Sequence, residues 1–244
     1  MNINEYINYL VKWLQKQVQK AKQQGVIVGV SGGIDSAVVA ALAKKAFPDK
    51  YLTVWMPCFS SILDKHCVED LIDSLKLKTV TVDLSTTFTT MKDSLFNSGV
   101  EQSDLALMNI KPRLRMTTLY SMAKTHKYLV LGTDNAAEWK LGYFTKYGDG
   151  GVDLLPIIHL LKREVKQVAH ILNIPSSIIN RAPSAGLFEN QLDETEIGVS
   201  YDIIDDYLSG KMIDPKAKSR IKYFFSISSH KRKKIPTPLK MIKK

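Results

Sequence analysis

Cysteine is scarce in this chain of 244 residues, which contains only two and therefore no disulfide framework. Cys58 and Cys67 form neither a redox nor a metal-binding spacing, so we expect both to be structural. No apolar run approaches the roughly 18 residues that cross a bilayer. The first five residues lack the basic and apolar segments of a signal peptide. These absences predict a cytoplasmic protein without a membrane partner.

No internal repeat, low-complexity linker or joint rich in proline and glycine divides the chain. Its length fits one large α/β domain, with two small domains as the alternative. A hydrophobic fraction of 45% is ordinary for a globular protein with a substantial core. We expect a single domain over residues 1–244, with an N-terminal helix at 1–24, an α/β core at 25–210 and a basic helix and tail at 211–244.

The net charge of +10 arises entirely from the C-terminal end of the chain. Residues 1–210 carry 22 basic and 23 acidic side chains, whereas residues 211–244 carry 12 basic side chains and one acidic side chain, Asp214. A tail of this kind can be a solvated terminus, an RNA-binding arm or a flap that folds over an anionic ligand. The charge alone favours the solvated terminus.

Hydrophobic patterns predict strands that alternate with helices. Apolar residues between positions 3 and 18 recur at helical spacing, and Gly25 ends this helix. Residues 26–30 are continuously apolar, as is typical of a strand buried on both faces. The other predicted strands are 51–56, 79–83, 128–131 and 152–155, and the other predicted helices are 37–47, 64–75 with Asp64 as N-cap, 87–96, 110–125, 162–172, 196–208 and 215–225. This alternation predicts a Rossmann-like α/β fold, a parallel sheet with helices on both faces and ligands at the carboxyl ends of the strands.

A glycine-rich turn joins the strand at 26–30 directly to the next helix. Its two adjacent glycines let successive backbone N–H groups point at one place, where no Cβ blocks an approaching anion. Two serine hydroxyls and the positive end of the helix add to the attraction for phosphate. The turn matches neither a Walker A loop nor the Gly-x-Gly-x-x-Gly pattern of dinucleotide folds. Its residues are Gly29, Val30, Ser31, Gly32, Gly33, Ile34, Asp35 and Ser36.

The string Ser-Gly-Gly-x-Asp-Ser after a strand resembles the PP-loop of the ATP pyrophosphatase superfamily, which cleaves ATP between the α- and β-phosphates. The alternative is a tight strand-to-helix turn with Asp35 near the N-cap. The resemblance implies that the turn binds ATP phosphates and that the fold is similar to that of adenine nucleotide alpha hydrolases. Asp35 is then a natural Mg²⁺ ligand, because pyrophosphate would otherwise repel a neighbouring carboxylate.

A long loop separates the predicted strands at 128–131 and 152–155, and a loop of this length inside a compact domain is usually functional. Its strings Gly-Thr-Asx-x-x-x-Glu and Gly-Tyr-Phe-Thr-Lys-Tyr-Gly-Asp-Gly-Gly-x-Asp resemble the signature of the ammonia-dependent NAD synthetase family. Further matches, in family order between about residues 25 and 234, are Asn-Ile-Lys-Pro-Arg-x-Arg-Met at 109–116, Gln-x-Asp-Glu at 191–194, Tyr-Asp-x-Ile-Asp at 201–205 and His-Lys at 230–231.

This resemblance implies an amide-forming ligase that makes NAD from deamido-NAD and ammonia, the final step of NAD biosynthesis. The carboxylate would be activated as an adenylate at the expense of ATP, with release of AMP and pyrophosphate. The resemblance also implies Mg²⁺ as a cofactor and a homodimer as the assembly. The synthetase region uses the 244 residues and leaves none for a glutaminase domain, so free ammonia is the expected nitrogen source.

The resemblance assigns roles residue by residue. Thr133, Lys162 and Ser184 would contact ATP together with the PP-loop, and Ser184 stands where the family usually has threonine. Asp35 and Glu138 would hold Mg²⁺, and with Lys162 and Asp149 they form the expected catalytic set. Asp149 is one candidate for ordering ammonia. The residues implied to bind deamido-NAD are Arg113, Lys146, Asp153, His230 and Lys231.

Each of these side chains also has an ordinary structural interpretation. Glu138 could be an exposed loop acid, and Arg113 could pair with an acid on the surface. Lys162 could be solvated at a helix start, although a cation there opposes the helix dipole and needs an anionic partner. The segment Trp-Met-Pro at 55–57 replaces a basic residue expected near the adenine. Because His230 and Lys231 lie in the basic tail, the resemblance favours a flap for that segment.

Two other functions remain open from the sequence. A PP-loop tRNA-modifying enzyme would hold RNA with the basic tail, but thiolation cysteines and a dedicated RNA domain are missing. A non-catalytic module that senses ATP would need the PP-loop, yet it gives no reason for the spacing of Glu138, Lys146 and Asp153. We therefore expect small-molecule partners, namely ATP, deamido-NAD and ammonia, and no nucleic acid.

Overall fold

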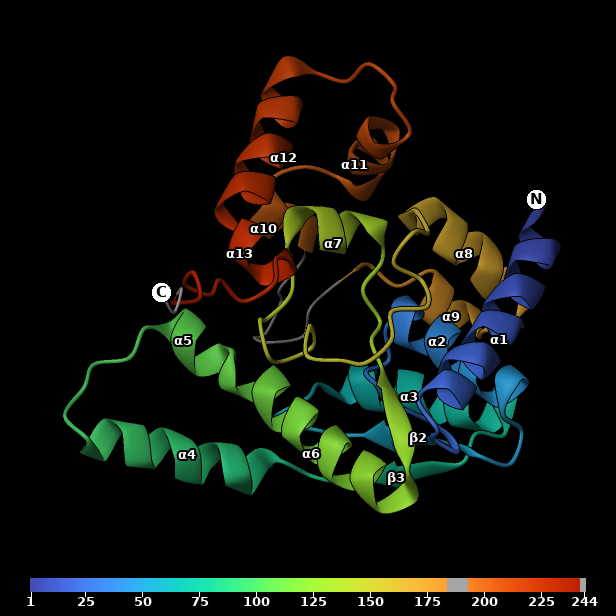
Figure 1. Cartoon of the computed structure of the whole chain (residues 1–244), viewed down its shortest axis with the longest axis horizontal. Helices are drawn as coiled ribbons and strands as arrows, with labels where there is room; N and C mark the ends of the chain where they lie inside the picture. Colours follow the sequence, from blue (N-terminus) through green and yellow to red (C-terminus); the bar gives the residue numbers. More distant parts are fainter. Residues whose placement is uncertain (184–192, 242–244) are drawn as a thin grey trace.

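A parallel four-stranded sheet lies at the centre of the computed structural model, which describes residues 1–183 and 193–241 (Figure 1). The strands are β1 (Gly25–Val30), β2 (Tyr51–Trp55), β3 (Thr79–Thr81) and β4 (Tyr128–Leu131), in the order β3-β2-β1-β4. β1 pairs with both β2 and β4, and five of its six residues are buried because they have neighbours on every side. The predicted parallel sheet is confirmed.

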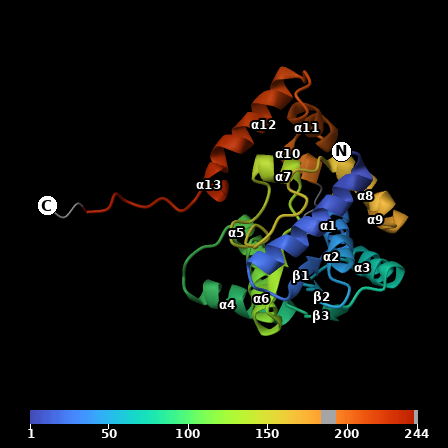
Figure 2. The same cartoon turned by 45° about the vertical axis from the view of Figure 1, so that its right-hand side comes forward.

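One face of the sheet carries the larger hydrophobic core. It is formed by β1 residues such as Val26 and Val28 together with the apolar faces of five helices. These helices are α1 (Ile3–Lys20), α2 (Ile34–Ala46), α3 (Ile62–Leu75), α8 (Lys162–Ile171) and α9 (Ser176–Ile179). Figure 2 shows α1 crossing this face beside α2.

The opposite face is covered by α4 (Ser85–Asn97), α5 (Asp104–Met108) and α6 (Ile110–His126). Here Ile27 of β1 and Val130 of β4 pack with Phe88 and Leu119 in a second core. Helices on both faces of a parallel sheet are the arrangement that the sequence predicts.

A third apolar cluster lies beyond the carboxyl ends of the strands (Figure 1). It joins α7 (Ala136–Leu141) to the C-terminal helices α10 (Asp193–Ile197), α11 (Tyr201–Leu208) and α12 (Pro215–Ile227). The short helix α13 (Ser229–Arg232) follows α12. Beyond α13, residues 233–241 are exposed and run away from the body of the protein (Figure 2). The basic segment thus contributes two helices beside the cavity described below, followed by a solvated tail.

Three predicted elements differ from the structure, and one helix was not predicted. The N-cap of α3 is Ser61 and not Asp64, which lies three residues later and whose carboxylate accepts a hydrogen bond from the Ser61 N–H at 2.9 Å. Residues 152–155 form no strand but a single bridge between Leu131 and Leu154. The helix predicted at 196–208 is two helices, because Gly198 adopts a φ of +76° and Ser200 starts α11. The long loop contains α7, which the prediction missed.

Within the described residues, the longest and most apolar helices still fall short of what a membrane span requires.

Candidate active site

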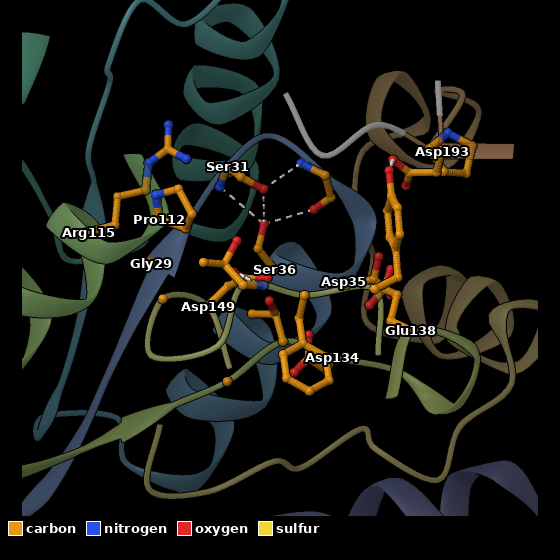
Figure 3. Close-up of a pocket in the computed structure, with 18 of the residues that line it drawn as sticks. Gly29, Ser31, Asp35, Ser36, Pro112, Arg115, Asp134, Glu138, Asp149 and Asp193 are labelled. Atoms are coloured by element: carbon orange, nitrogen blue, oxygen red, sulfur yellow. Dashed lines mark hydrogen bonds between the residues drawn. The ribbon is translucent and has the colours of Figure 1, made fainter. Parts of the chain in front are cut away.

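A cavity of about 590 Å³ opens at the carboxyl edge of the sheet (Figure 3). Its walls come from the PP-loop, the ends of β2 and β4, α6, α7 with the loop that follows it, and α13. The sequence-predicted site residues that line it are Gly29, Val30, Ser31, Gly33, Ile34, Asp35, Ser36, Thr133, Glu138, Asp149, Lys162, His230 and Lys231. The fold therefore brings together residues from Gly29 to Lys231, almost the whole length of the chain.

Internal hydrogen bonds hold the PP-loop in one shape. The buried Ser36 hydroxyl donates to the Gly33 carbonyl at 2.9 Å and accepts from the Ser31 N–H at 3.2 Å (Figure 3). Gly32 has a φ of +80°, and a Cβ there would come within 2.9 Å of the Asp64 carbonyl oxygen. Glycine is therefore required at this position, and the loop presents its backbone at the start of α2.

The buried ammonium of Lys162 lies between two carboxylates, one of which belongs to the PP-loop. Lys162 Nζ is 2.5 Å from Asp35 Oδ2 and 3.5 Å from Glu138 Oε1, although the three residues come from α8, α2 and α7. Burial alone would lower the pKa of Lys162, but the two carboxylates outweigh it and raise that pKa. Burial, followed by the charge of Asp35, raises the pKa of Glu138 to about 8, against the opposing effect of Lys162.

Backbone and side-chain contacts fix the two carboxylates. Asn135 caps α7 with its Oδ1, and its Nδ2 donates to Asp35 Oδ1 at 3.0 Å. Glu138 Oε2 accepts from the Asn135 N–H at 3.1 Å, and its Oε1 accepts from the Tyr201 hydroxyl at 3.2 Å. Asn135 thus connects both acids, and the alternative of an exposed loop acid for Glu138 is wrong.

Asp205 resolves the conflict between Lys162 and the dipole of α8. Its fully buried carboxylate accepts from the Lys162 N–H at 3.1 Å and from the Arg163 N–H at 2.9 Å. An acid at the helix start offsets the cation there, so Lys162 can stay buried. The solvated alternative for Lys162 is wrong as well, because its side chain is only 5% exposed.

The two carboxylates fit Mg²⁺ only in company with phosphate. Across residues 1–183 and 193–241, no three histidine, cysteine, aspartate or glutamate side chains cluster as metal ligands. Mg²⁺ takes six oxygen ligands and commonly combines one or two carboxylates with substrate phosphates and water. Asp35 and Glu138, beside a loop that the sequence predicts to bind phosphate, have the chemistry of such a partial site.

The loop after α7 closes the cavity from the other side. Asp149 Oδ1 accepts from the Thr145 N–H at 2.9 Å, and Lys231 Nζ donates to the carbonyls of Gly142 and Phe144 at 2.7 and 2.6 Å. Burial raises the pKa of Asp149. Asp149 and Lys231 therefore fix the loop as well as line the cavity.

Three residues assigned to deamido-NAD lie outside the cavity lining, namely Arg113, Lys146 and Asp153. Arg113 is exposed, and its Nε donates to the Lys146 carbonyl at 3.4 Å. Asp153 accepts from the Val130 N–H at 2.8 Å and from the Tyr120 hydroxyl at 3.1 Å, so both of its oxygens are used. Ser184, assigned to ATP, lies outside the described residues.

Replacing Asp153 with alanine is expected to lower the free energy of unfolding by about 1–3 kcal/mol, because the Val130 N–H loses its acceptor next to the sheet. Urea denaturation measures this change. If the free energy of unfolding stayed the same and only the KM for deamido-NAD rose, the structural role of Asp153 would be contradicted.

Sequence reasoning missed several residues that shape the cavity. Arg115 Nε donates to the Met56 carbonyl at 3.1 Å, and Arg181 contacts both Asp64 and the Gly32 carbonyl. Both arginines line the cavity. A local signal was available for Asn135, because an asparagine three residues before a glutamate is a capping-box spacing. Tyr201 and Asp205 were in a recognised string without a role, and Arg181 carried no local signal.

Comparisons with known proteins point to one family. The family model described as NAD synthase matches residues 6–240. The NH(3)-dependent NAD(+) synthetase of Mesoplasma florum is 52% identical over 232 residues, which cover 95% of this chain and 95% of that protein. The enzyme of the same name from Carboxydothermus hydrogenoformans is 52% identical over 174 residues, or 71% of this chain and 72% of that protein.

Solved structures show the same fold. The NMN synthetase from Francisella tularensis superposes with a TM-score of 0.92 at 38% identity, covering 98% of this chain and 99% of that one. The NH3-dependent NAD synthetase from Campylobacter jejuni superposes with a TM-score of 0.81 at 26% identity, covering 98% of this chain and 100% of that one. These likenesses confirm the predicted Rossmann-like fold.

Proposed function

The chain belongs to the NAD synthase family, and we propose that the cavity at the carboxyl edge of its sheet is the active site. The protein is an amide-forming ligase of the NH3-dependent NAD⁺ synthetase kind, with ATP as co-substrate. Deamido-NAD and ammonia are joined to give NAD, while ATP is converted to AMP and pyrophosphate. The observation that carries the site assignment is the buried Asp35–Lys162–Glu138 cluster beside the PP-loop.

In the first step, the nicotinate carboxylate attacks the α-phosphorus of ATP. A bond forms between a carboxylate oxygen and this phosphorus, and the bond to the β-phosphate breaks. The PP-loop, comprising Gly29, Val30, Ser31, Gly32, Gly33, Ile34, Asp35 and Ser36, would hold the departing pyrophosphate at the start of α2, where N–H groups and the helix dipole stabilise negative charge. Thr133 and Ser184 would add contacts to the nucleotide.

Lys162 would place its positive charge against the phosphates in this step. Its ammonium is already desolvated and held by carboxylates, so it needs little reorganisation when the phosphates arrive. Asp35 and Glu138 would hold Mg²⁺, which when bound supplies further positive charge to the phosphates. Lys162 and the metal would then share the two carboxylates.

In the second step, ammonia attacks the activated carbonyl and AMP leaves. Ammonium has no free electron pair, so the site must remove a proton before attack. Asp149, whose buried carboxylate is oriented by the Thr145 N–H, would order ammonia next to the activated carbonyl. His230 and Lys231 would reach the substrate from α13.

Arg113, Lys146 and Asp153 would bind deamido-NAD at a part of the site that a second subunit completes. Arg113 and Lys146 contact each other outside the cavity, where two cations suit the pyrophosphate of the dinucleotide. We therefore propose a homodimer, which light scattering tests through the molar mass in solution. A monomeric and fully active protein would rule it out.

A second substrate deserves comparison because the NMN synthetase structure superposes with a TM-score of 0.92. An enzyme that forms this mononucleotide amide would act on the corresponding mononucleotide acid by the same two steps. The 52% identity to NAD(+) synthetases favours the dinucleotide acid. Values of kcat/KM for the two acids, measured side by side, decide between them.

Nothing in the comparisons favours the tRNA-modifying alternative, and we propose that the protein has no nucleic-acid partner. We also place it in the cytoplasm, because Cys58 and Cys67 are free, buried thiols that suit a reducing compartment.

The proposed reaction is tested with ATP, Mg²⁺, deamido-NAD and an ammonium salt. NAD, AMP and pyrophosphate are expected in equal amounts. The appearance of ADP and phosphate, or AMP release that does not depend on deamido-NAD, would overturn the mechanism.

A further inference from the structure

The buried carboxylate of Asp134 has no role in the steps above. Asp134 lies shortly after the end of β4 at Leu131, lines the cavity and is 4% exposed (Figure 3). Among the buried side-chain oxygen and nitrogen atoms of the described residues, only Asp134 Oδ2 lacks a hydrogen-bond partner. Because an unpartnered buried carboxylate is costly, its presence inside a cavity points to a partner that a ligand supplies.

The surroundings of Asp134 select the charge of that ligand. Charged groups from four other segments act on Asp134. Three of them are acidic, namely Asp149, Glu138 and Asp35, and the fourth is Lys231. The cation among them, Lys231, already donates to the carbonyls of Gly142 and Phe144. Burial and then the three acids raise the pKa of Asp134. Lys162 offsets part of the charge of Asp35 and Glu138, so Asp149 is the acid that acts most on Asp134, and its charge favours a small cation that carries hydrogen-bond donors.

The neighbouring acids are committed to other groups. Asp149 holds the loop through the Thr145 N–H, and Asp35 and Glu138 share Lys162. Oδ2 of Asp134 is therefore the buried side-chain acceptor without a partner in the described part of the cavity, with Asp149 contributing negative charge next to it.

Only one substrate of the proposed reaction has the matching chemistry. ATP and deamido-NAD are anionic at their reacting ends, whereas ammonium is a cation with four N–H donors. We propose that Asp134 Oδ2 binds ammonium and accepts its proton, an inference that rests on the ligase function proposed above.

The proton and electron balance of this step is complete. Ammonium gives one proton to Asp134 and becomes ammonia, whose freed electron pair forms the C–N bond at the carbonyl carbon of the adenylate. The bond from that carbon to the bridging oxygen breaks, and AMP leaves with its electron pair. A second proton passes from nitrogen to the AMP phosphate, which leaves the neutral amide.

The substitution Asp134→Asn tests this proposal, because it keeps the shape of the side chain and removes its charge. The KM for ammonium is expected to rise about 10- to 100-fold, the loss that removal of a charge-assisted hydrogen bond brings. Exchange of labelled pyrophosphate into ATP, which depends on deamido-NAD and needs no ammonia, should stay close to the unsubstituted rate. Asp134→Glu, which retains a carboxylate, should recover part of the ammonium affinity.

Hydroxylamine provides the sharpest comparison, since it is uncharged near neutral pH and needs no carboxylate to remove a proton first. Asp134→Asn should use it nearly as well as the unsubstituted enzyme does. Asp73→Asn, at an exposed position on α3, is the control for the exchange of acid for amide. An unchanged KM for ammonium, or an equal loss of pyrophosphate exchange and amide formation, would overturn the role of Asp134. Absence of exchange in the unsubstituted enzyme would instead overturn the ligase function itself.

Discussion

Replacing Asp35 with asparagine is expected to lower kcat/KM by about 10³-fold, because the active site loses a charge that acts on the reacting phosphates. Asp35 Oδ2 is 2.5 Å from Lys162 Nζ, and the same carboxylate is a proposed ligand of Mg²⁺. The substitution leaves Lys162 with only Glu138, at 3.5 Å, and removes one metal ligand. Steady-state kinetics with ATP and deamido-NAD measure the loss.

The fold should survive this substitution, since asparagine has nearly the volume of aspartate. Asp49→Asn is the matched control, because the Asp49 side chain is 94% exposed and lies far from the cavity. Its kcat/KM should equal that of the unsubstituted enzyme. A decrease of less than about tenfold in Asp35→Asn would mean that neither Lys162 nor the metal depends on this carboxylate.

Replacing Asp205 with alanine is expected to lower the free energy of unfolding by about 3–5 kcal/mol, because a buried group with several charge-assisted bonds disappears. The carboxylate is completely buried and accepts from the N–H groups of Lys162 and Arg163 and from Arg163 Nε at 3.2 Å. Without it, both N–H groups at the start of α8 lose their acceptor. Urea denaturation gives the stability change.

The adjacent acid provides a control of the same kind. Asp206 pairs with Arg163 and Lys211, but its side chain is 35% exposed. Alanine at this position should cost no more than about 1 kcal/mol, since solvent screens exposed ion pairs. Similar losses for Asp205→Ala and Asp206→Ala would contradict the importance of burial at the start of α8.

The sequence predicted the PP-loop because its determinants are local. Eight consecutive residues contain the glycines, the hydroxyls and the helix start, and each acts on its immediate neighbours. Gly32 illustrates this, since its positive φ is a property of a single backbone position. The continuous apolar run of β1 was equally readable, because burial on both faces leaves no polar alternation.

The hydrogen-bond partners of the predicted site residues could not be predicted from local sequence patterns. Asp205 reaches Lys162 from 43 positions away, and Asn135 reaches Asp35 from 100 positions away. These contacts depend on how α7, α8 and α11 pack above the sheet, which no local pattern encodes. Asp134 is a similar case, because its importance lies in a hydrogen bond that its surroundings do not provide.

The predicted helix boundaries were wrong where one residue changed the direction of the backbone. The apolar spacing from 196 to 208 fits one helix, but Gly198 turns the chain and lets α10 and α11 pack separately. That turn brings the Tyr201 hydroxyl to Glu138. A departure from the simplest helical pattern is therefore part of how the site is built.

The central claim is that the substrate carboxylate attacks the α-phosphorus of ATP while the PP-loop holds the outer phosphates. Deamido-NAD labelled with oxygen-18 in its carboxylate tests it in a single turnover, with mass spectrometry of the products. The account predicts one labelled oxygen in AMP and none in pyrophosphate. Unlabelled AMP, or label in pyrophosphate or phosphate, would contradict it.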